Sequence, residues 1–238
     1  MKLGKRLKKI ESMITQDYDH IWDCCCDHGF LGMSLLDPEL TATVHFVDIV
    51  PELIQAVDDK LNKHVDQRSA NGPSTPFNTH CISTSDLPLE SNPGRHLIII
   101  AGVGGDLMID FIDAINARHP KQKIDFLLCP VHHLYNVRKK LQELNFKLKD
   151  EKLIQENQRF YEIIYASNKA SSNHQQDSIS SVGEQIWQEN SNNTNDNNDA
   201  LIYLSKTIEH YQRIALGNED TDVKQILEAY TLIKKSYY

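Results

Sequence analysis

The stretch HIWDCCCDHGFLG, residues 20–32, decides the fold, because a short apolar run leads directly into a polar turn and a helix start. Residues 20–23 are predicted to form a strand, and the helix is predicted to begin near Leu31. Thr43–Asp48 (TVHFVD) repeats the pattern with a β-branched and aromatic run before a helix that starts at Pro51. A strand, a turn, a helix and a second strand in this order predict a βαβ unit with parallel strands.

The rest of the first two thirds of the chain continues this alternation. Further strands are predicted at residues 77–83, 97–101 and 126–130, with amphipathic helices after the last two. Residues 147–154 and 160–166 alternate in hydrophobicity across an Asn-containing turn, which predicts a hairpin. The expected fold is therefore α/β: a Rossmann-like, mostly parallel sheet with helices on both faces and an antiparallel terminal hairpin.

The composition changes after residue 168, and we expect two domains, residues 1–168 and 169–238. Residues 171–181 are polar, and residues 189–199 (ENSNNTNDNND) are of low complexity and are expected to form a mobile loop. Two amphipathic helices follow, and Gly217 is a natural end for the first of them. The second domain is thus predicted to be a helical hairpin that packs on itself or on the first domain.

Composition narrows the class of protein. The chain has 238 residues, 40% hydrophobic and 24% charged, which is enough to bury a core without disulfides. Its basic start lacks the apolar segment of a secretory signal, and no apolar run is long enough to span a bilayer. The five cysteines are odd in number and three are adjacent, which favours a reducing, cytoplasmic setting.

Charge is distributed unevenly along the chain. The formal net charge of -8 argues against a general nucleic-acid binder. However, residues 2–9 carry five lysines or arginines, including Arg6, on a predicted amphipathic helix. Such a helix suits contacts with RNA phosphates, and it is equally consistent with a solvated charged face.

Carboxylates stand at the predicted strand ends, where ligands bind in open parallel sheets. Asp23 and Asp27 would repel a pyrophosphate, and the three-glycine pattern of a dinucleotide site is absent, so a nicotinamide dehydrogenase is disfavoured. A cofactor that carries a sulfonium and an ammonium group, such as S-adenosylmethionine (SAM), would be attracted by them. Asp48 is placed to accept hydrogen bonds from ribose hydroxyls, and Asp86 from an adenine amino group.

Two further motifs concern the backbone and the thiols. Residues 101–105 (AGVGG) place three glycines after a buried strand, which lets the backbone approach a ligand closely. The CCC run beside His28 invites comparison with a zinc site, but no second ligand pair is evident. We therefore expect buried thiols and no metal.

Taken together, these motifs resemble those of the bacterial tRNA adenine-N1 methyltransferases that modify position 22. The resemblance covers almost the whole chain, including the helical C-terminus. It rests on Lys5-Arg6-Leu7, Asp23, Asp27-His28-Gly29, Leu31, Ala101–Gly105, Pro130 and Tyr161-Glu162-Ile163. The chain departs from the family pattern at Cys25, where glycine is expected, and at Gly32, where proline is expected. Cys129 and Val131 stand where Gln and Asn would flank Pro130.

The resemblance implies a class I methyltransferase with SAM as cofactor and tRNA as partner. Asp27 would accept a hydrogen bond from the N6 amino group of the target adenine, and His28 would contact the substrate or orient Asp27. Candidate cofactor-binding residues are Asp23, Cys25, Gly29, Asp48, Ile49, Asp86, Leu87, Ala101 and Gly102. Candidate substrate-binding residues are Arg6, Gly104, Gly105 and Pro130.

Two alternatives from other classes remain open. One is a SAM-dependent methyltransferase that acts on another RNA or on a small molecule. The other is a non-catalytic RNA-binding protein that has kept the fold, which the residues at positions 25 and 131 would favour. Binding of SAM separates the second alternative from the enzymes, and no oligomeric state is predicted.

Overall fold

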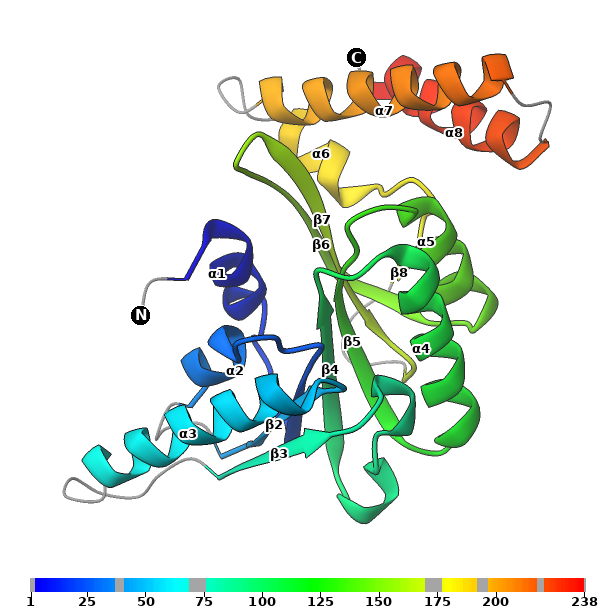
Figure 1. Ribbon diagram of the computed structural model, residues 1–238. Helices are drawn as coiled ribbons and strands as arrows, with labels where there is room; N and C mark the ends of the chain where they lie inside the picture. The colour runs from blue at the N-terminus through cyan, green and yellow to red at the C-terminus, as the bar shows by residue number, and fades with distance from the viewer. Residues whose placement is uncertain are drawn as a thin grey trace.

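The computed structural model describes residues 3–36, 41–68, 76–169, 177–191, 197–217 and 221–237. Its centre is one eight-stranded sheet in the order β3-β2-β1-β4-β5-β7-β6-β8 (Figure 1). The strands are β1 (His20–Cys24), β2 (Thr43–Asp48), β3 (Phe77–Cys81), β4 (Arg95–Ala101), β5 (Lys123–Cys129), β6 (Lys147–Glu156), β7 (Arg159–Ser167) and β8 (Asp177–Ser178). The helices are α1 (Lys5–Ser12), α2 (Phe30–Ser34), α3 (Pro51–Arg68), α4 (Gly105–Arg118), α5 (Leu134–Glu143), α6 (Gln185–Ser191), α7 (Asn197–Gly217) and α8 (Thr221–Tyr237), with short 3-10 turns at Thr84–Asp86 and Leu89–Ser91.

The strand pairing confirms the predicted Rossmann-like sheet. The first five strands are parallel, with β1 between β2 and β4. The β6–β7 hairpin is antiparallel, with β7 against β5, as expected from the alternating sequence. The short strand β8 was not expected, and it pairs with β6 at the far edge. It lies beyond the predicted domain boundary at residue 168, so the sheet draws one strand from the second part of the chain.

The central strands are buried on both faces, which explains their unbroken apolar sequences. In β4, Ile98 and Ile100 belong to one core cluster, and Leu97 and Ile99 belong to the cluster on the opposite face. Helices α1, α2 and α3 cover one face of the sheet, and α4 and α5 cover the other (Figure 1). Each fully buried aliphatic side chain of this kind stabilises the fold by about 1.5–3 kcal/mol.

A row of histidines crosses the sheet on β1 to β4. His20 Nδ1 lies 3.0 Å from His45 Nε2, and His45 Nδ1 lies 2.9 Å from His80 Nε2. Trp22 stacks on His45 and donates its indole N–H to His96 Nδ1 at 3.2 Å. Burial, with the neighbouring imidazoles, lowers the pKa of His45 to about 3 and that of His96 to about 4. The rings of His45 and His96 are therefore neutral at physiological pH.

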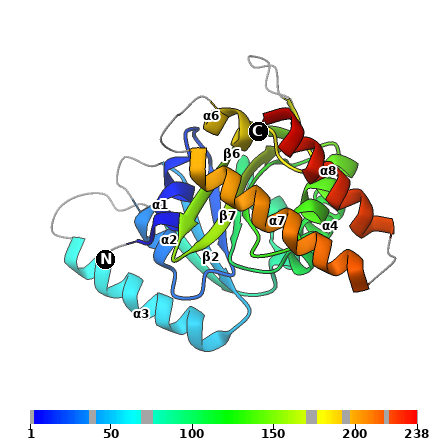
Figure 2. The same cartoon turned by 90° about the horizontal axis from the view of Figure 1, so that it is seen from above.

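The C-terminal helices form the predicted helical pair, with α7 and α8 side by side across the β6–β7 hairpin (Figure 2). Helix α6 was not expected. The predicted loop at residues 189–199 is wrong at both ends, because Glu189–Ser191 belong to α6 and residues 197–199 begin α7. The rest of that prediction lies outside the described residues. Within the described ranges, no helix is both long and apolar enough for a membrane span.

A buried ionic cluster joins these helices to the sheet. Arg138 on α5 pairs with Glu151 on β6 and Glu162 on β7, both at 2.6 Å, and all three side chains are fully buried. Glu151 also accepts the backbone N–H groups of residues 184 and 185, just before and at the start of α6. Glu162 accepts the hydroxyl of Tyr203 on α7 at 2.7 Å. Every oxygen in the cluster thus has a donor, which offsets the cost of burying the charges.

Candidate active site

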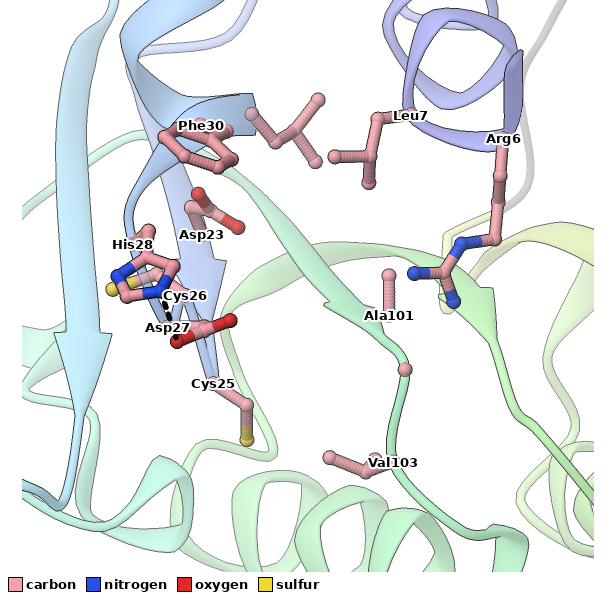
Figure 3. A pocket seen from close by; sticks show the side chains of 12 residues that line it. Arg6, Leu7, Asp23, Cys25, Cys26, Asp27, His28, Phe30, Ala101 and Val103 are labelled. Carbon is pink, nitrogen blue, oxygen red and sulfur yellow. Dashed lines mark ion pairs between the residues drawn. The ribbon is translucent and has the colours of Figure 1, made fainter. Parts of the chain in front are cut away.

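A pocket of about 240 Å³ opens between α1 and the carboxyl ends of β1 and β4 (Figure 3). This is the edge where ligands bind in open α/β sheets. Three segments supply its walls: the start of α1, the turn from β1 into α2, and the turn after β4. The lining residues are Arg6, Leu7, Asp23, Cys25, Cys26, Asp27, His28, Phe30, Leu31, Ala101, Gly102 and Val103.

The turn after β1 has an unusual backbone. Cys25 and Asp27 adopt φ angles of 53° and 50°, in the left-handed region that residues with a side chain seldom enter. Hydrogen bonds to the neighbouring strand hold the turn in place: Cys26 donates its N–H to the carbonyl of Val47 at 3.1 Å, and Asp27 donates to Asp48 Oδ2 at 3.1 Å. Such strain persists only where the surroundings fix it, and it is concentrated at functional sites.

Asp48 lies half-buried at the end of β2, and neither it nor Ile49 is among the residues that line the pocket. Each of its oxygens accepts one backbone N–H at 3.1 Å, from Asp27 to Oδ2 and from Val50 to Oδ1. A carboxylate oxygen can accept two hydrogen bonds, so both oxygens keep a lone pair for a further donor. The neighbouring Ile49 is 69% exposed and offers an apolar surface beside the carboxylate. The two residues suit a ribose and a flat base, and their assignment to the cofactor stays a prediction.

Asp23 is buried at the end of β1 and faces the pocket. Burial raises the pKa of its carboxyl group to about 7, the N–H of Gly32 on Oδ2 at 2.8 Å opposes the rise, and the charge of Asp48 adds to it. The carboxyl group therefore changes charge near neutral pH. A cation placed beside it would favour the ionised form. Gly32 leaves no space for a larger residue, since a Cβ there would lie 2.4 Å from the ring of Phe46.

The three adjacent cysteines were expected to be buried thiols, and Cys24 and Cys26 are buried whereas Cys25 is half-buried. Burial raises the pKa of all three thiols. Cys25 Sγ lies 3.7 Å from the hydroxyl of Thr84 and points away from Arg6 in Figure 3. Across the described part of the chain, no group of three or more histidine, cysteine or acidic side chains is arranged to hold a metal ion.

Asp27 and His28 stand at the mouth of the pocket. Their side chains are 69% and 53% exposed, and His28 Nε2 lies 3.7 Å from Asp27 Oδ1 (Figure 3). That distance is longer than a hydrogen bond, so the carboxylate remains available to an incoming donor. Lys60 donates to the carbonyl of His28 at 3.1 Å and lies 5.1 Å from the centre of the Phe30 ring. The mouth therefore combines one available carboxylate with a half-exposed aromatic ring.

Arg6 reaches the pocket from α1, across from Asp27 (Figure 3). Its guanidinium lies over the ring of Tyr161 at 4.9 Å, and its buried Nε has no hydrogen-bond partner. A Cβ at Gly102 would lie 3.6 Å from Arg6 Nη1, so the turn after β4 passes close to the guanidinium. Arg6 is thus a positive group on the wall opposite the acidic turn.

Gly104, Gly105 and Pro130, which were predicted to contact the substrate, are not among the residues that line the pocket, and neither is Gly29, which was predicted to contact the cofactor. Gly104 and Gly105 open α4 under the loop that follows β5. A Cβ on Gly104 would lie 2.5 Å from the imidazole of His132, and one on Gly105 would lie 2.6 Å from the carbonyl of His132. Pro130 is buried at the end of β5, before Val131. These residues position the loop, and a direct role with substrate stays a prediction.

Asp86 and Leu87, predicted to contact the cofactor, are also outside the pocket lining. Asp86 forms an ion pair with Arg118 at 2.7 Å, and both side chains are about half exposed. The Leu87 side chain is 1% exposed and belongs to the core, while its carbonyl lies 2.8 Å from His119 Nε2. An adenine amino group would therefore share Asp86 with Arg118.

Sequence reasoning did not name several lining residues as site residues. Leu7, Cys26, Phe30, Leu31 and Val103 all face the pocket. Phe30 carried a usable signal in the sequence, because it is an aromatic residue directly after a polar turn. In the structure its side chain is 39% exposed. The positions of Leu7 and Val103 depend on how α1 packs against the sheet, which no local pattern encodes.

The comparisons with known proteins agree with this geometry. A family model described as "Methyltransferase domain" matches residues 3–164. A search of curated proteins gives no match. Among solved structures, M. capricolum TrmK in complex with S-adenosyl-homocysteine superposes with a TM-score of 0.71 at 18% identity, over 99% of this chain and 97% of that one.

Two further structures extend over the whole fold. The B. subtilis M1A22 tRNA methyltransferase TrmK gives a TM-score of 0.67 at 21% identity, covering 98% of each chain. Streptococcus pneumoniae Sp1610 gives 0.70 at 18% identity, over 98% of this chain and 99% of that one. At these identities the likeness establishes a shared fold, including the C-terminal helices. Because the family model spans most of the chain, from the pocket-lining helix α1 to strand β7, this protein belongs to the methyltransferase domain family.

Proposed function

We propose that this protein transfers a methyl group from SAM to N1 of an adenine in tRNA. One observation carries the proposal: the backbone of Asp27 is hydrogen-bonded to the side chain of Asp48, at 3.1 Å. This contact joins the carboxylate suited to a nucleoside cofactor with the carboxylate that faces the open mouth of the pocket. Structural similarity to the B. subtilis M1A22 tRNA methyltransferase supports adenine 22 as the target.

The described residues fit SAM. Asp48 has free lone pairs for the ribose hydroxyls, and Ile49 offers an apolar surface for the adenine ring. Asp23, with its raised pKa, would be held ionised by the ammonium group. When bound, SAM supplies an electrophilic methyl group on a positively charged sulfur. Cys25 would leave space for the cofactor, because its side chain turns towards Thr84.

The acceptor side needs positioning more than acid–base chemistry. N1 of adenine carries a lone pair, so no residue has to remove a proton, and correct placement supplies most of the rate. Asp27 would accept a hydrogen bond from the N6 amino group and stabilise the positive charge that develops on the base. The base must leave its stack to reach Asp27. Phe30 would pack against the extruded ring, and Arg6 would contact a phosphate.

The decisive experiment is transfer of a labelled methyl group from SAM to an unmodified tRNA transcript, followed by identification of the labelled nucleoside. We expect 1-methyladenosine, and no label in a matched transcript with guanosine at position 22. Label in another nucleoside or in a small molecule would move the protein to a different acceptor. If calorimetry detects no SAM binding, the non-catalytic RNA-binding alternative replaces the proposal.

A cytoplasmic location belongs to the same proposal. All five cysteines are free thiols in the structure, including the adjacent Cys24, Cys25 and Cys26. Unpaired cysteines in this number suit a reducing compartment. The tRNA substrate is found in that compartment as well.

A further inference from the structure

Four residues at the mouth of the pocket, Asp27–Phe30, carry most of the chemistry assigned to the acceptor, and we call them the mouth segment. Asp27, His28 and Phe30 are exposed and lie together on one side of the pocket (Figure 3). The backbone is bent sharply, because Asp27 and Gly29 adopt left-handed φ angles of 50° and 69°. An exposed segment of this kind has little packing of its own, so its position depends on the neighbours that hold it.

Helix α3 is the neighbour that contacts the mouth segment from outside the pocket. A Cβ on Gly29 would lie 3.0 Å from Val57 Cγ2, so the helix passes directly against the backbone. Lys60 follows Val57 by three residues and therefore projects from the same face of α3. Its Nζ donates to the carbonyl of His28 at 3.1 Å. The helix thus contacts the segment through one apolar side chain and one cation.

The hydrogen bond from Lys60 fixes one peptide group of the segment. The carbonyl of His28 and the N–H of Gly29 belong to the same planar unit and point in opposite directions. Gly29 donates that N–H to the carbonyl of Cys26 at 2.7 Å. The peptide group is therefore held at both ends, by the turn on one side and by Lys60 on the other. Removal of the ammonium group would loosen the backbone from which Asp27 projects.

The same ammonium group also lies against an aromatic ring. Lys60 Nζ is 5.1 Å from the centre of the Phe30 ring, and the ring of His28 lies 5.6 Å from that of Phe30. A cation over an aromatic ring is attracted by the negative face of the ring. Lys60 therefore acts on the segment at two points, the backbone of His28 and the side chain of Phe30. It does so from outside the site, since it is not among the residues that line the pocket.

We propose that Lys60 is a positioning residue for methyl transfer, which holds Asp27 and Phe30 in place through the mouth segment. Lys60 itself contacts neither the cofactor nor the base. This inference rests on the proposed function and adds to it a residue of α3 that acts on the rate of transfer. A displacement of about 1 Å can lower a rate by about 100-fold, so an anchor outside the pocket has a measurable effect.

The first test separates rate from binding. Lys60→Met keeps the apolar stem and removes the ammonium group, and Lys63→Met makes the same change at an exposed lysine three residues further along α3. Methyl transfer from SAM is measured over a range of concentrations of an unmodified tRNA transcript. In Lys60→Met, kcat should fall about 10- to 100-fold while KM for tRNA changes little, because the loss affects placement of the base. Lys63→Met should match the parent protein.

The second test asks whether Lys60 acts through Asp27. Lys60→Met is combined with Asp27→Asn in a double-mutant cycle, with kcat as the readout. Once the carboxylate of Asp27 is gone, its placement no longer matters. The added loss from Lys60→Met should therefore be less than about threefold in the Asp27→Asn background. Effects that multiply in full would show that Lys60 acts independently of Asp27, and the inference would be wrong.

Amide hydrogen exchange gives a readout that does not depend on activity. In Lys60→Met, the amides of residues 26–33 should exchange faster, because the peptide group after His28 has lost one of its two anchors. Exchange elsewhere, the melting temperature and SAM affinity should stay close to those of the parent protein. Unchanged exchange in residues 26–33 would show that Lys60 does not hold the segment, which also overturns the inference.

The outcomes separate this inference from the proposed function. If the parent protein methylates tRNA and Lys60→Met is as active as Lys63→Met, the role of Lys60 is refuted and the proposed function stands. If the parent protein transfers no methyl group to tRNA, the proposed function fails and the role of Lys60 in transfer fails with it. A lower kcat at nearly unchanged KM, with faster exchange confined to residues 26–33, supports the role of Lys60.

Discussion

Replacement of Asp48 by asparagine tests the cofactor assignment most directly. Asparagine keeps the shape of the side chain, but one of the two oxygens becomes an NH2 group that cannot accept a hydrogen bond. In the structure each oxygen of Asp48 accepts one backbone N–H at 3.1 Å and keeps one lone pair for a ligand. Asp48→Asn therefore removes the charge, one acceptor that could face a ligand, and one of the two hydrogen bonds that Asp48 accepts from the backbone.

The two losses appear in different measurements. A hydrogen bond to a charged group contributes about 1.5–3 kcal/mol, so SAM should bind roughly 10- to 150-fold more weakly. The lost bond to the backbone acts on folding and contributes about 0.5–1.5 kcal/mol, which lowers the melting temperature by only a few degrees. The loss in SAM affinity should therefore exceed the loss in stability.

Isothermal titration calorimetry with SAM and with S-adenosyl-homocysteine is the assay, with Asp59→Asn as the matched control. Asp59 is an exposed carboxylate on α3 whose hydrogen-bond partner is Gln55. We expect the control to bind both ligands like the parent protein. If Asp48→Asn also binds SAM within twofold of the parent, Asp48 only holds the turn and the reasoning from its free lone pairs is refuted.

Three further predictions follow from other parts of the structure. Asp27→Asn should leave SAM affinity nearly unchanged and lower the methyl-transfer rate constant by about two to three orders of magnitude, as loss of comparable transition-state stabilisers does; full activity would make Asp27 a structural residue. Arg138→Met leaves two buried carboxylates without a positive partner, so chemical denaturation should show a loss of about 3–5 kcal/mol, and a loss below 1 kcal/mol would contradict the burial argument. The histidine row should make the fold acid-labile: the folded pKa values of His45 and His96 lie below the ordinary value near 6.5, so the unfolded chain binds more protons and stability falls below about pH 6.5 by up to about 1.4 kcal/mol per pH unit for each ring. Asp23, with its raised pKa, has the opposite effect and makes the fold more stable as the pH is lowered from 7 to 4. If the denaturation midpoint does not decrease when the pH is lowered from 7 to 5, the rings of His45 and His96 are not buried as neutral groups.

The central sheet was predictable because its strands carry the information locally. The run from Leu97 to Ala101 is apolar throughout and is closed by glycines, so only its first residues, Arg95 and His96, were missed. The acidic strand ends were predictable for the same reason, since Asp48 closes a clear β pattern. Here the local signal and the tertiary environment agree.

The missed elements depend on contacts between distant residues. Helix α6 has seven residues and follows a polar segment, so no periodicity reveals it. Its start is held by Glu151, whose carboxylate accepts the N–H groups of residues 184 and 185 from more than thirty positions away. The ion pair of Asp86 with Arg118 is equally non-local, and it places Asp86 outside the pocket lining that its position after β3 suggested.

The cluster around Arg138 has a consequence for how the molecule moves. Separation of the C-terminal helices from the sheet would strip Glu162 of Tyr203 and Glu151 of its backbone donors, leaving charges in an apolar space. Movement of α7 away from the β6–β7 hairpin is therefore opposed by the cost of exposing these buried charges to an apolar space without their donors. A chain cut at residue 168 would lose these donors together with the helices, so Glu151 and Glu162 would keep only the Arg138 side chain as a partner.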